Sequence, residues 1–221
     1  MKAEQYQLPV EMMAKAIDKM DVESPQVYGQ FLAQTFYYVS HSTRMLAFAA
    51  GMMKNSEEVH FRRFVRHIGE ESAHEVLAEK DLQGLGMKVS DYAQLPETRA
   101  LWEPQYYKIL HVSPFALMGY VIALEYFSCA HLPRFYQKVL TAYGPTACRF
   151  VKLHAEEDPD HIVKALDLTS QLSEAVQESI LVNIQQTAKG YSAMVNACGE
   201  FARQSRVKTK NEYGATDLAA P

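Results

Sequence analysis

The chain of 221 residues is 48% hydrophobic and 22% charged, with a formal net charge of −4, as expected for one globular domain. A weak negative charge without a basic patch argues against a nucleic-acid partner. We find no apolar run of membrane-spanning length and no secretory signal, and we expect a cytoplasmic protein without a membrane partner. Three cysteines without a Cys-x-x-Cys pair are typical of a reducing compartment.

Apolar residues recur at spacings of three and four nearly throughout, which is the period of amphipathic helices, and no strand pattern is evident. The expected helices cover about residues 8–20, 25–54, 56–84, a stretch ending near 111, 113–130, 145–168 and 171–203. Pro25 suits a first helical turn, Ser56 suits an N-cap, and Pro133 predicts a kink or division. No linker divides the chain, so we predict one helical bundle over 1–205 and a loosely held tail over 206–221.

Residues 154–161 read HAEEDPDH, which places two histidines and four acids in eight residues. On a helix that turns about 100° per residue, His154, Asp158 and His161 share an arc of about 60°. This arc is a candidate half of a metal site, and a solvated charged face is the alternative. Pro159 either starts a helical segment or kinks the helix, which would weaken a second metal.

The same spacing appears earlier, in residues 67–74, which read HIGEESAH. His67, Glu71 and His74 repeat the order imidazole, carboxylate, imidazole with three and then two intervening residues. Because the chain contains only eight histidines, two such matches are hard to explain as coincidence. The repeated spacing therefore favours two halves of one site over two solvated faces.

Glu125 is the only charged residue in the stretch 115–130, FALMGYVIALEYFSCA, which is apolar nearly all round. Such a helix is expected to be buried. An unpaired ionised carboxylate would be unfavourable there, so Glu125 must be protonated, paired with a cation or bound to a metal. The simple alternative to a metal is an ion pair with Arg44 or Arg134.

Three carboxylates and three imidazoles make up the candidate ligand set, which is Glu71, His74, Glu125, His154, Asp158 and His161. Two divalent cations would neutralise three converging carboxylates and replace their lost hydration. Carboxylate and imidazole suit iron or manganese, and the absence of thiolate argues against structural zinc. The ferritin-like plan needs a further acid from another helix, but residues 25–54 contain no Asp or Glu.

With this ordered set the chain resembles the heme-oxygenase-like diiron oxidase family, within the fold shared by heme oxygenase, thiaminase II and pyrroloquinoline-quinone synthase. The matching motifs are EESAHE at 70–75, ALEYF at 123–127 and HAEEDPDH, and the resemblance runs from about 25 to 205. It implies an all-α bundle of about seven helices with the six ligands named above. It also implies two irons, with manganese at one site as an alternative, and O2 as co-substrate for oxidising a small organic substrate.

Five further residues are candidates for the pocket, namely Tyr37, His41, His67, Tyr120 and Cys129. Tyr37 and His41 lie four residues apart on one face, and stacked core aromatics are the alternative. His67 shares the arc of Glu71 but matches no ligand position of the family, which favours a hydrogen-bonded core histidine. Tyr120 is expected near the helix face that carries Glu125.

Other classes of protein remain open at this point. A thiaminase-II-like hydrolase would use Cys129 as nucleophile, four residues after Glu125, although a buried structural cysteine is the commoner case. A heme protein would leave the acidic cluster unexplained, and a metal-free oxidase would use the histidines as acid and base. A non-catalytic helical partner protein is the last alternative. We expect exposed apolar faces to serve a homodimer instead.

Overall fold

A computed structural model describes the backbone of residues 2–156 and 160–213, and the side chains of residues 2–156 and 162–200. Within these ranges the chain is helical and contains no strand. The α-helices are α1 Ala3–Lys19, α2 Pro25–Val39, α3 Ser42–Gly51, α4 Glu58–Glu70, α5 His74–Gly84, α6 Pro96–His111, α7 Met118–Tyr143, α8 Arg149–Ala155, α9 Asp160–Ser170 and α10 Glu174–Tyr213. Short 3-10 turns are η1 Asn55–Glu57, η2 Val89–Asp91, η3 Pro114–Leu117 and η4 Pro145–Ala147.

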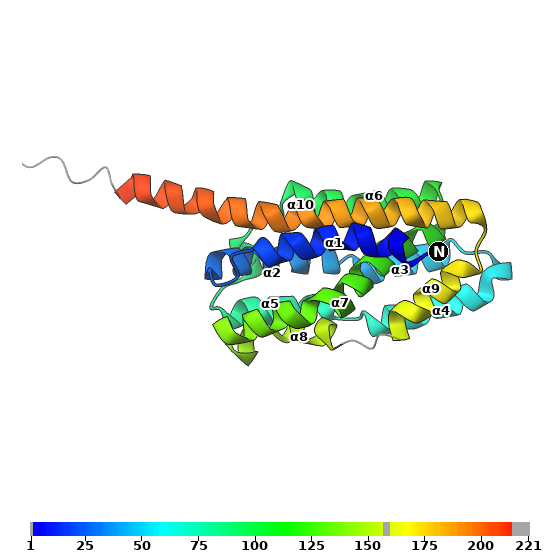
Figure 1. The fold of residues 1–221 in the computed structure, drawn as a ribbon, viewed down its shortest axis with the longest axis horizontal. Coiled ribbons are helices and arrows are strands. Elements are labelled where there is room, and N and C mark those ends of the chain that lie inside the picture. The colour runs from blue at the N-terminus through cyan, green and yellow to red at the C-terminus, as the bar shows by residue number, and fades with distance from the viewer. Residues whose placement is uncertain (1, 157–159, 214–221) are drawn as a thin grey trace, which may run out of the picture.

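The bundle is built around α7, which packs against α1, α8, α9 and α10 (Figure 1). The long helix α10 runs beside α1 and also contacts α2 and α6, and its C-terminal end extends beyond the other helices. Side chains of α7 are buried on most of its circumference, among them Tyr120, Ile122 and Phe127. The all-α fold class predicted from the sequence is therefore confirmed.

One expectation about apolar runs was wrong. Residues Pro114–Tyr143 are long and apolar enough to cross a membrane, judged by length and composition alone. However, 72% of the most apolar window of this segment is buried within the bundle. A central core helix passes such a test because neighbouring helices, rather than lipid, cover its apolar surface.

Each of three helices expected to be continuous is divided in the structure. The expected helix 25–54 is interrupted at Ser40 and His41, and 56–84 is interrupted between α4 and α5, where Ala73 has φ +66°. The expected helix 145–168 ends its first part at Ala155. The spacing of apolar residues did not reveal these breaks because the helices on both sides still face the same core.

The ends of two other helices also differ from the expectation. Helix α7 continues past Pro133 as far as Tyr143, so the expected end near residue 130 was wrong. It stops at Gly144, which has φ +71°, a conformation that glycine adopts without steric cost. Helix α10 continues to Tyr213, beyond the expected end near 203, and the domain boundary at 205/206 stays a prediction.

Candidate metal centre

Glu71 and His74 approach each other from the ends of two helices. Helix α4 ends at Glu70, Glu71 is its C-cap, and α5 begins at His74. Ala73 lies in the left-handed region, which turns the chain between the two helices. One carboxylate oxygen of Glu71 lies 3.5 Å from Nδ1 of His74. The two residues are thus close, although they do not share one helix face as the sequence interpretation assumed.

His67 lies between two carboxylates. Its Nε2 atom is 3.2 Å from Oε1 of Glu125 on α7 and 3.6 Å from Oε1 of Glu71. Glu125 is buried, and its second oxygen has no hydrogen-bond partner among the described residues. The proposed arginine partners lie elsewhere, because Arg134 pairs with Asp18 and Arg44 donates to a main-chain carbonyl. Among the described residues, His67 is therefore the basic partner of Glu125.

His154 joins this group from α8. Its Nδ1 atom lies 2.8 Å from the main-chain carbonyl oxygen of Phe150. A carbonyl oxygen only accepts hydrogen bonds, so Nδ1 carries the proton and the lone pair of the neutral ring is on Nε2. The rings of His74 and His154 have centroids 4.9 Å apart. One ligand atom from each of Glu71, His74 and His154 lies within 4.8 Å of the others.

Burial and mutual pairing set the charges of these side chains. Burial lowers the pKa of His154, which favours the neutral ring that a metal requires, although the Phe150 carbonyl opposes this shift. Burial also acts to lower the pKa of His67, but its pairing with Glu125 and Glu71 dominates and raises the pKa to about 9. Burial acts to raise the pKa of Glu71, but His67 and His74 bring it well below its usual range.

His67, Glu71, Glu125 and His154 border a cavity of about 70 Å³ within the bundle. Most of its wall is apolar, with residues from α2, α3, α7 and α8, and the described lining contains no Lys or Arg. The polar groups other than the titrating centre are the hydroxyls of Tyr38, Ser42, Tyr120, Ser128 and Tyr191. Burial raises the pKa of Tyr120 well above its usual value, so its phenol stays protonated. The cavity therefore combines a largely apolar wall with a few hydroxyls and the titrating centre.

Of the five further pocket candidates, the structure brings two to the cavity. His67 and Tyr120 line it. Cys129, Cys148 and Cys198 form no disulfide among the described residues, and none of the three is among the described residues that line the cavity. A cysteine nucleophile at this cavity therefore has no support from the described residues.

Tyr37 and His41 face another part of the bundle. The hydroxyl of Tyr37 donates to the carbonyl of Tyr92 at 2.8 Å. The ring of His41 stacks on Trp102 with centroids 3.6 Å apart, and its Nδ1 lies 3.0 Å from the hydroxyl of Tyr106. Because α2 ends before Ser40, the face shared by Tyr37 and His41 does not continue along α3 into the cavity.

Asp158 and the side chain of His161 lie outside the described residues, as does Pro159. Helix α8, which carries His154, ends at Ala155. The contribution of Asp158 and His161 to the centre stays a prediction.

His67 is a buried, hydrogen-bonded histidine, as the sequence favoured, and it also lines the cavity. It contacts both carboxylates that the described part of the centre contains. The available signal was its position one helical turn before Glu71, on the same face of α4. Because no ligand motif of the resembled family includes this position, its role was assigned to the core.

Comparison with known proteins places this architecture in a class. The heme-oxygenase-like fold is shared with a domain of unknown function from Shewanella denitrificans (TM-score 0.78, 16% identity, covering 97% of this chain and 96% of that one). TenA homologues are also similar, one from Pseudomonas syringae (TM-score 0.70, 16% identity, 89% and 91% covered) and one from Pyrococcus furiosus (TM-score 0.67, 12% identity, 88% and 98% covered). A search of curated proteins finds no match.

The family follows from the sequence match. The model of the iron-containing redox enzyme family matches residues 29–192, a span that includes every candidate ligand. The chain belongs to this family. The predicted resemblance to heme-oxygenase-like proteins is confirmed by both comparisons.

Proposed function

We propose that the protein is a non-heme dimetal oxidase or oxygenase that uses O2 to oxidise a small organic substrate. The single observation that carries this proposal is the convergence of Glu71, His74 and His154, whose ligand atoms lie within 4.8 Å of one another, in a member of an iron-containing family. Iron at both positions is the primary expectation, with manganese at one position as the alternative.

The chemistry of the donor set fits a divalent cation. Bonds from such ions to nitrogen and oxygen are about 2.0–2.2 Å, so donors on one ion lie at most about 4 Å apart. A small contraction of the observed group would reach this geometry. The Oε2 atom of Glu125, which has no donor among the described residues, supports a second ligand position, because a buried carboxylate oxygen without a donor is unfavourable.

The six side chains of the ligand set, with Asp158 and His161 among them, would hold the ions, and bound ferrous iron would supply the activation of O2. The protein would position the ions, balance their charge with carboxylates and keep water away from them. His154 presents Nε2 because the Phe150 carbonyl holds its other nitrogen. The largely apolar wall would limit the access of water to the ligand set.

A thiaminase-II-like hydrolase is the second candidate, because TenA homologues share the fold. At 12–16% identity this likeness supports the fold alone. Against the hydrolase, none of the cysteines is among the described lining residues. Cleavage of thiamine by metal-free protein would favour it.

The test is anaerobic loading with ferrous iron, followed by metal analysis and O2 uptake with a panel of small organic substrates. We expect about two irons per chain and O2 uptake that one substrate class accelerates. Glu71→Gln should lose iron, whereas Glu58→Gln should not, because Glu58 is an exposed partner of Arg62. Failure of the wild-type protein to bind iron or manganese would contradict the proposal. The homodimer stays a prediction that the molar mass in solution checks.

A further inference from the structure

Helices α5 and α8, which carry His74 and His154, are joined by a buried carboxylate that does not belong to the candidate ligand set. Asp81 on α5 is fully buried. Its Oδ1 accepts the main-chain N–H of Arg149 at 2.9 Å, and its Oδ2 accepts that of Phe150 at 2.8 Å. These are the first residues of α8, whose N–H groups have no partner within the helix. Both oxygens act as acceptors, as in an ionised carboxylate.

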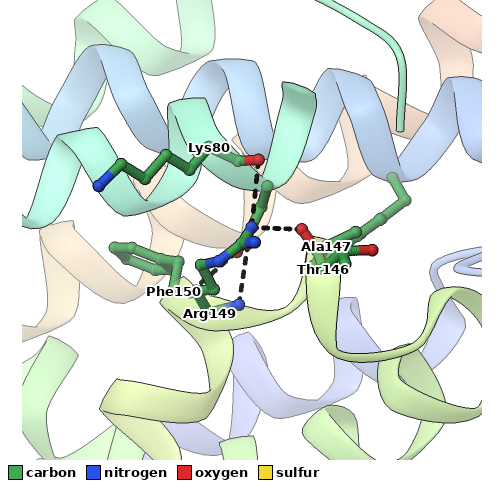
Figure 2. A network of polar contacts seen from close by, with 7 residues as sticks. Lys80, Thr146, Ala147, Arg149 and Phe150 are labelled. Atoms are coloured by element: carbon green, nitrogen blue, oxygen red, sulfur yellow. Dashed lines mark hydrogen bonds and ion pairs between the residues drawn. The ribbon is translucent and has the colours of Figure 1, made fainter. Parts of the chain in front are cut away.

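Figure 2 shows the surroundings of this contact. The guanidinium of Arg149 donates to the carbonyl oxygens of Lys80, at 3.3 Å, and of Thr146, and it lies 3.4 Å from Oδ1 of Asp81. The next carbonyl along the chain, that of Ala147, accepts from a buried tyrosine hydroxyl on α2 at 2.8 Å. The start of α8 is therefore held against both α5 and α2.

The contact continues to His154 through a single residue. Asp81 accepts the N–H of Phe150, and the carbonyl of the same Phe150 accepts Nδ1–H of His154. The rings of Phe150 and His154 also pack together, with centroids 4.1 Å apart. A displacement of Phe150 would thus move the group that sets both the tautomer and the orientation of the imidazole.

We propose that Asp81 is a positioning residue of the metal centre, which acts through the backbone of Phe150 to hold His154 with Nε2 facing the ligand set. This inference rests on the proposed function. Asp81 lies seven residues after His74 on the same face of α5, so one carboxylate fixes the helix of one histidine ligand relative to that of the other. The arrangement corresponds to a hydrogen-bonded outer layer of a metal site, whose loss typically weakens metal binding by about 10–100-fold.

The experiment compares Asp81→Asn with Asp91→Asn, using cobalt(II) as the probe under anaerobic conditions. Asparagine has one carbonyl oxygen and one NH2 group, so only one of the two main-chain N–H groups of α8 keeps an acceptor. The other N–H group would meet the NH2 group, which is also a donor. We expect Asp81→Asn to weaken cobalt binding by about 10–100-fold and to change the visible absorption of the bound ion. Asp91 accepts a single N–H on the exposed surface, so its variant should bind cobalt as the wild type does.

A second variant separates positioning from stability. Arg149→Met keeps the main-chain N–H groups that Asp81 accepts and removes the guanidinium contacts. It should lower the melting temperature without changing the affinity for cobalt. The inference is overturned if Asp81→Asn reduces the affinity no more than Arg149→Met does.

A measurement on the unmodified protein does not depend on the folding of any variant. The nitrogen shifts of His154 in metal-free protein should show the proton on Nδ1, and a proton on Nε2 would overturn the inference. The proposed function fails separately, when the wild-type protein binds no metal. Equal cobalt affinities in wild-type and Asp81→Asn protein would contradict only the positioning role of Asp81.

Discussion

The two segments with the spacing His-x3-acid-x2-His are supported in different ways. In the first, His67 lies on α4, Glu71 caps that helix, and His74 begins α5 after the left-handed Ala73. In the second, His154 lies one residue before the end of α8. Among the described residues, identical spacing therefore places the first histidine of each segment differently, within α4 for His67 and at the end of α8 for His154.

The difference also concerns what holds each histidine. The side chains of the first segment are held mainly by each other, through contacts of 3.2–3.6 Å among His67, Glu71, His74 and Glu125. His154 is held by the backbone of its own helix, which neighbouring helices fix in turn. The repeated spacing singled out Glu71, His74 and His154, which meet in the structure, but it does not reveal which contacts position them.

The largest expected effect tests whether both segments contribute to one centre. A ligand that binds only the folded state stabilises it by about 4 kcal/mol at a thousand times its dissociation constant. We expect zinc at that level to raise the unfolding free energy of wild-type protein by about this amount. His74→Ala and His154→Ala should each lose most of the gain, measured by denaturant unfolding with and without the metal.

His111→Ala is the matched control, because His111 lies on α6 and packs against exposed Tyr107. It should keep the full gain on metal loading. A His154→Ala protein that still gains as much as the wild type would show that the first segment binds metal alone. That result would contradict a shared centre, because the second segment would then contribute no ligand to it.

The next effect tests the external support of α8. In Tyr28→Phe the carbonyl of Ala147 loses its buried donor, while the ring keeps its stacking on Tyr143, with centroids 5.2 Å apart. An unsatisfied buried acceptor costs about 1–3 kcal/mol. We expect a loss of that size in unfolding free energy and little change from Tyr107→Phe, whose ring is 64% exposed. Equal values for the two variants would contradict the support that we assign to α2.

The sequence predicts the fold better than it predicts the geometry of the centre. The period of apolar residues locates the helices, because burial of one face depends only on residue type and spacing. The motifs also single out Glu71, His74, Glu125 and His154, which come close together in the structure. Ala73 carries no such signal, because alanine normally favours the helix that it interrupts here.

The supporting contacts were hidden for another reason. Asp81 belongs to none of the sequence motifs, yet it is fully buried against the start of α8. Its partners are main-chain N–H groups 68 and 69 residues further along the chain. Contacts of a side chain with distant backbone depend on tertiary packing, and residue identity does not encode them locally.

A smaller effect tests the turn between Glu71 and His74. Ala73 pays the steric cost of the left-handed region, about 1–2 kcal/mol, which glycine does not. Glycine also loses about 0.4–1 kcal/mol through the greater entropy of its unfolded chain. We expect Ala73→Gly to be neutral to slightly stabilising and Ala73→Val to lose about 1 kcal/mol, since β-branched residues fit this region worst.

Ala47 provides the contrast, because it is an exposed alanine within α3. There glycine should cost about 1 kcal/mol by ordinary helix propensity. A similar loss from glycine at positions 73 and 47 would show that the turn is a normal helical segment in solution. The first segment would then form one continuous helix from His67 to His74, and the difference in backbone support between the two segments would disappear.

The smallest effect concerns the break between α2 and α3, which lies outside the candidate centre. His41 stacks on Trp102, the single tryptophan of the chain. Burial and then the nearby charge of Arg44 lower the pKa of His41, although Glu103 opposes them. Since the folded state resists protonation, its stability should decline as the pH falls below the ordinary histidine pKa of about 6.5.

The same titration is visible in fluorescence, because a protonated imidazole quenches a stacked indole more than a neutral one does. Emission of Trp102 should fall at a midpoint below about pH 6.5, and the step should vanish in His41→Gln. Metal loading should leave this curve unchanged, because His41 is not among the residues that line the cavity. A midpoint that moves when metal binds would mean that the break at His41 responds to the centre. Metal binding would then be coupled to the protonation of His41, and the contacts that hold the two ligand segments would not be independent of this break.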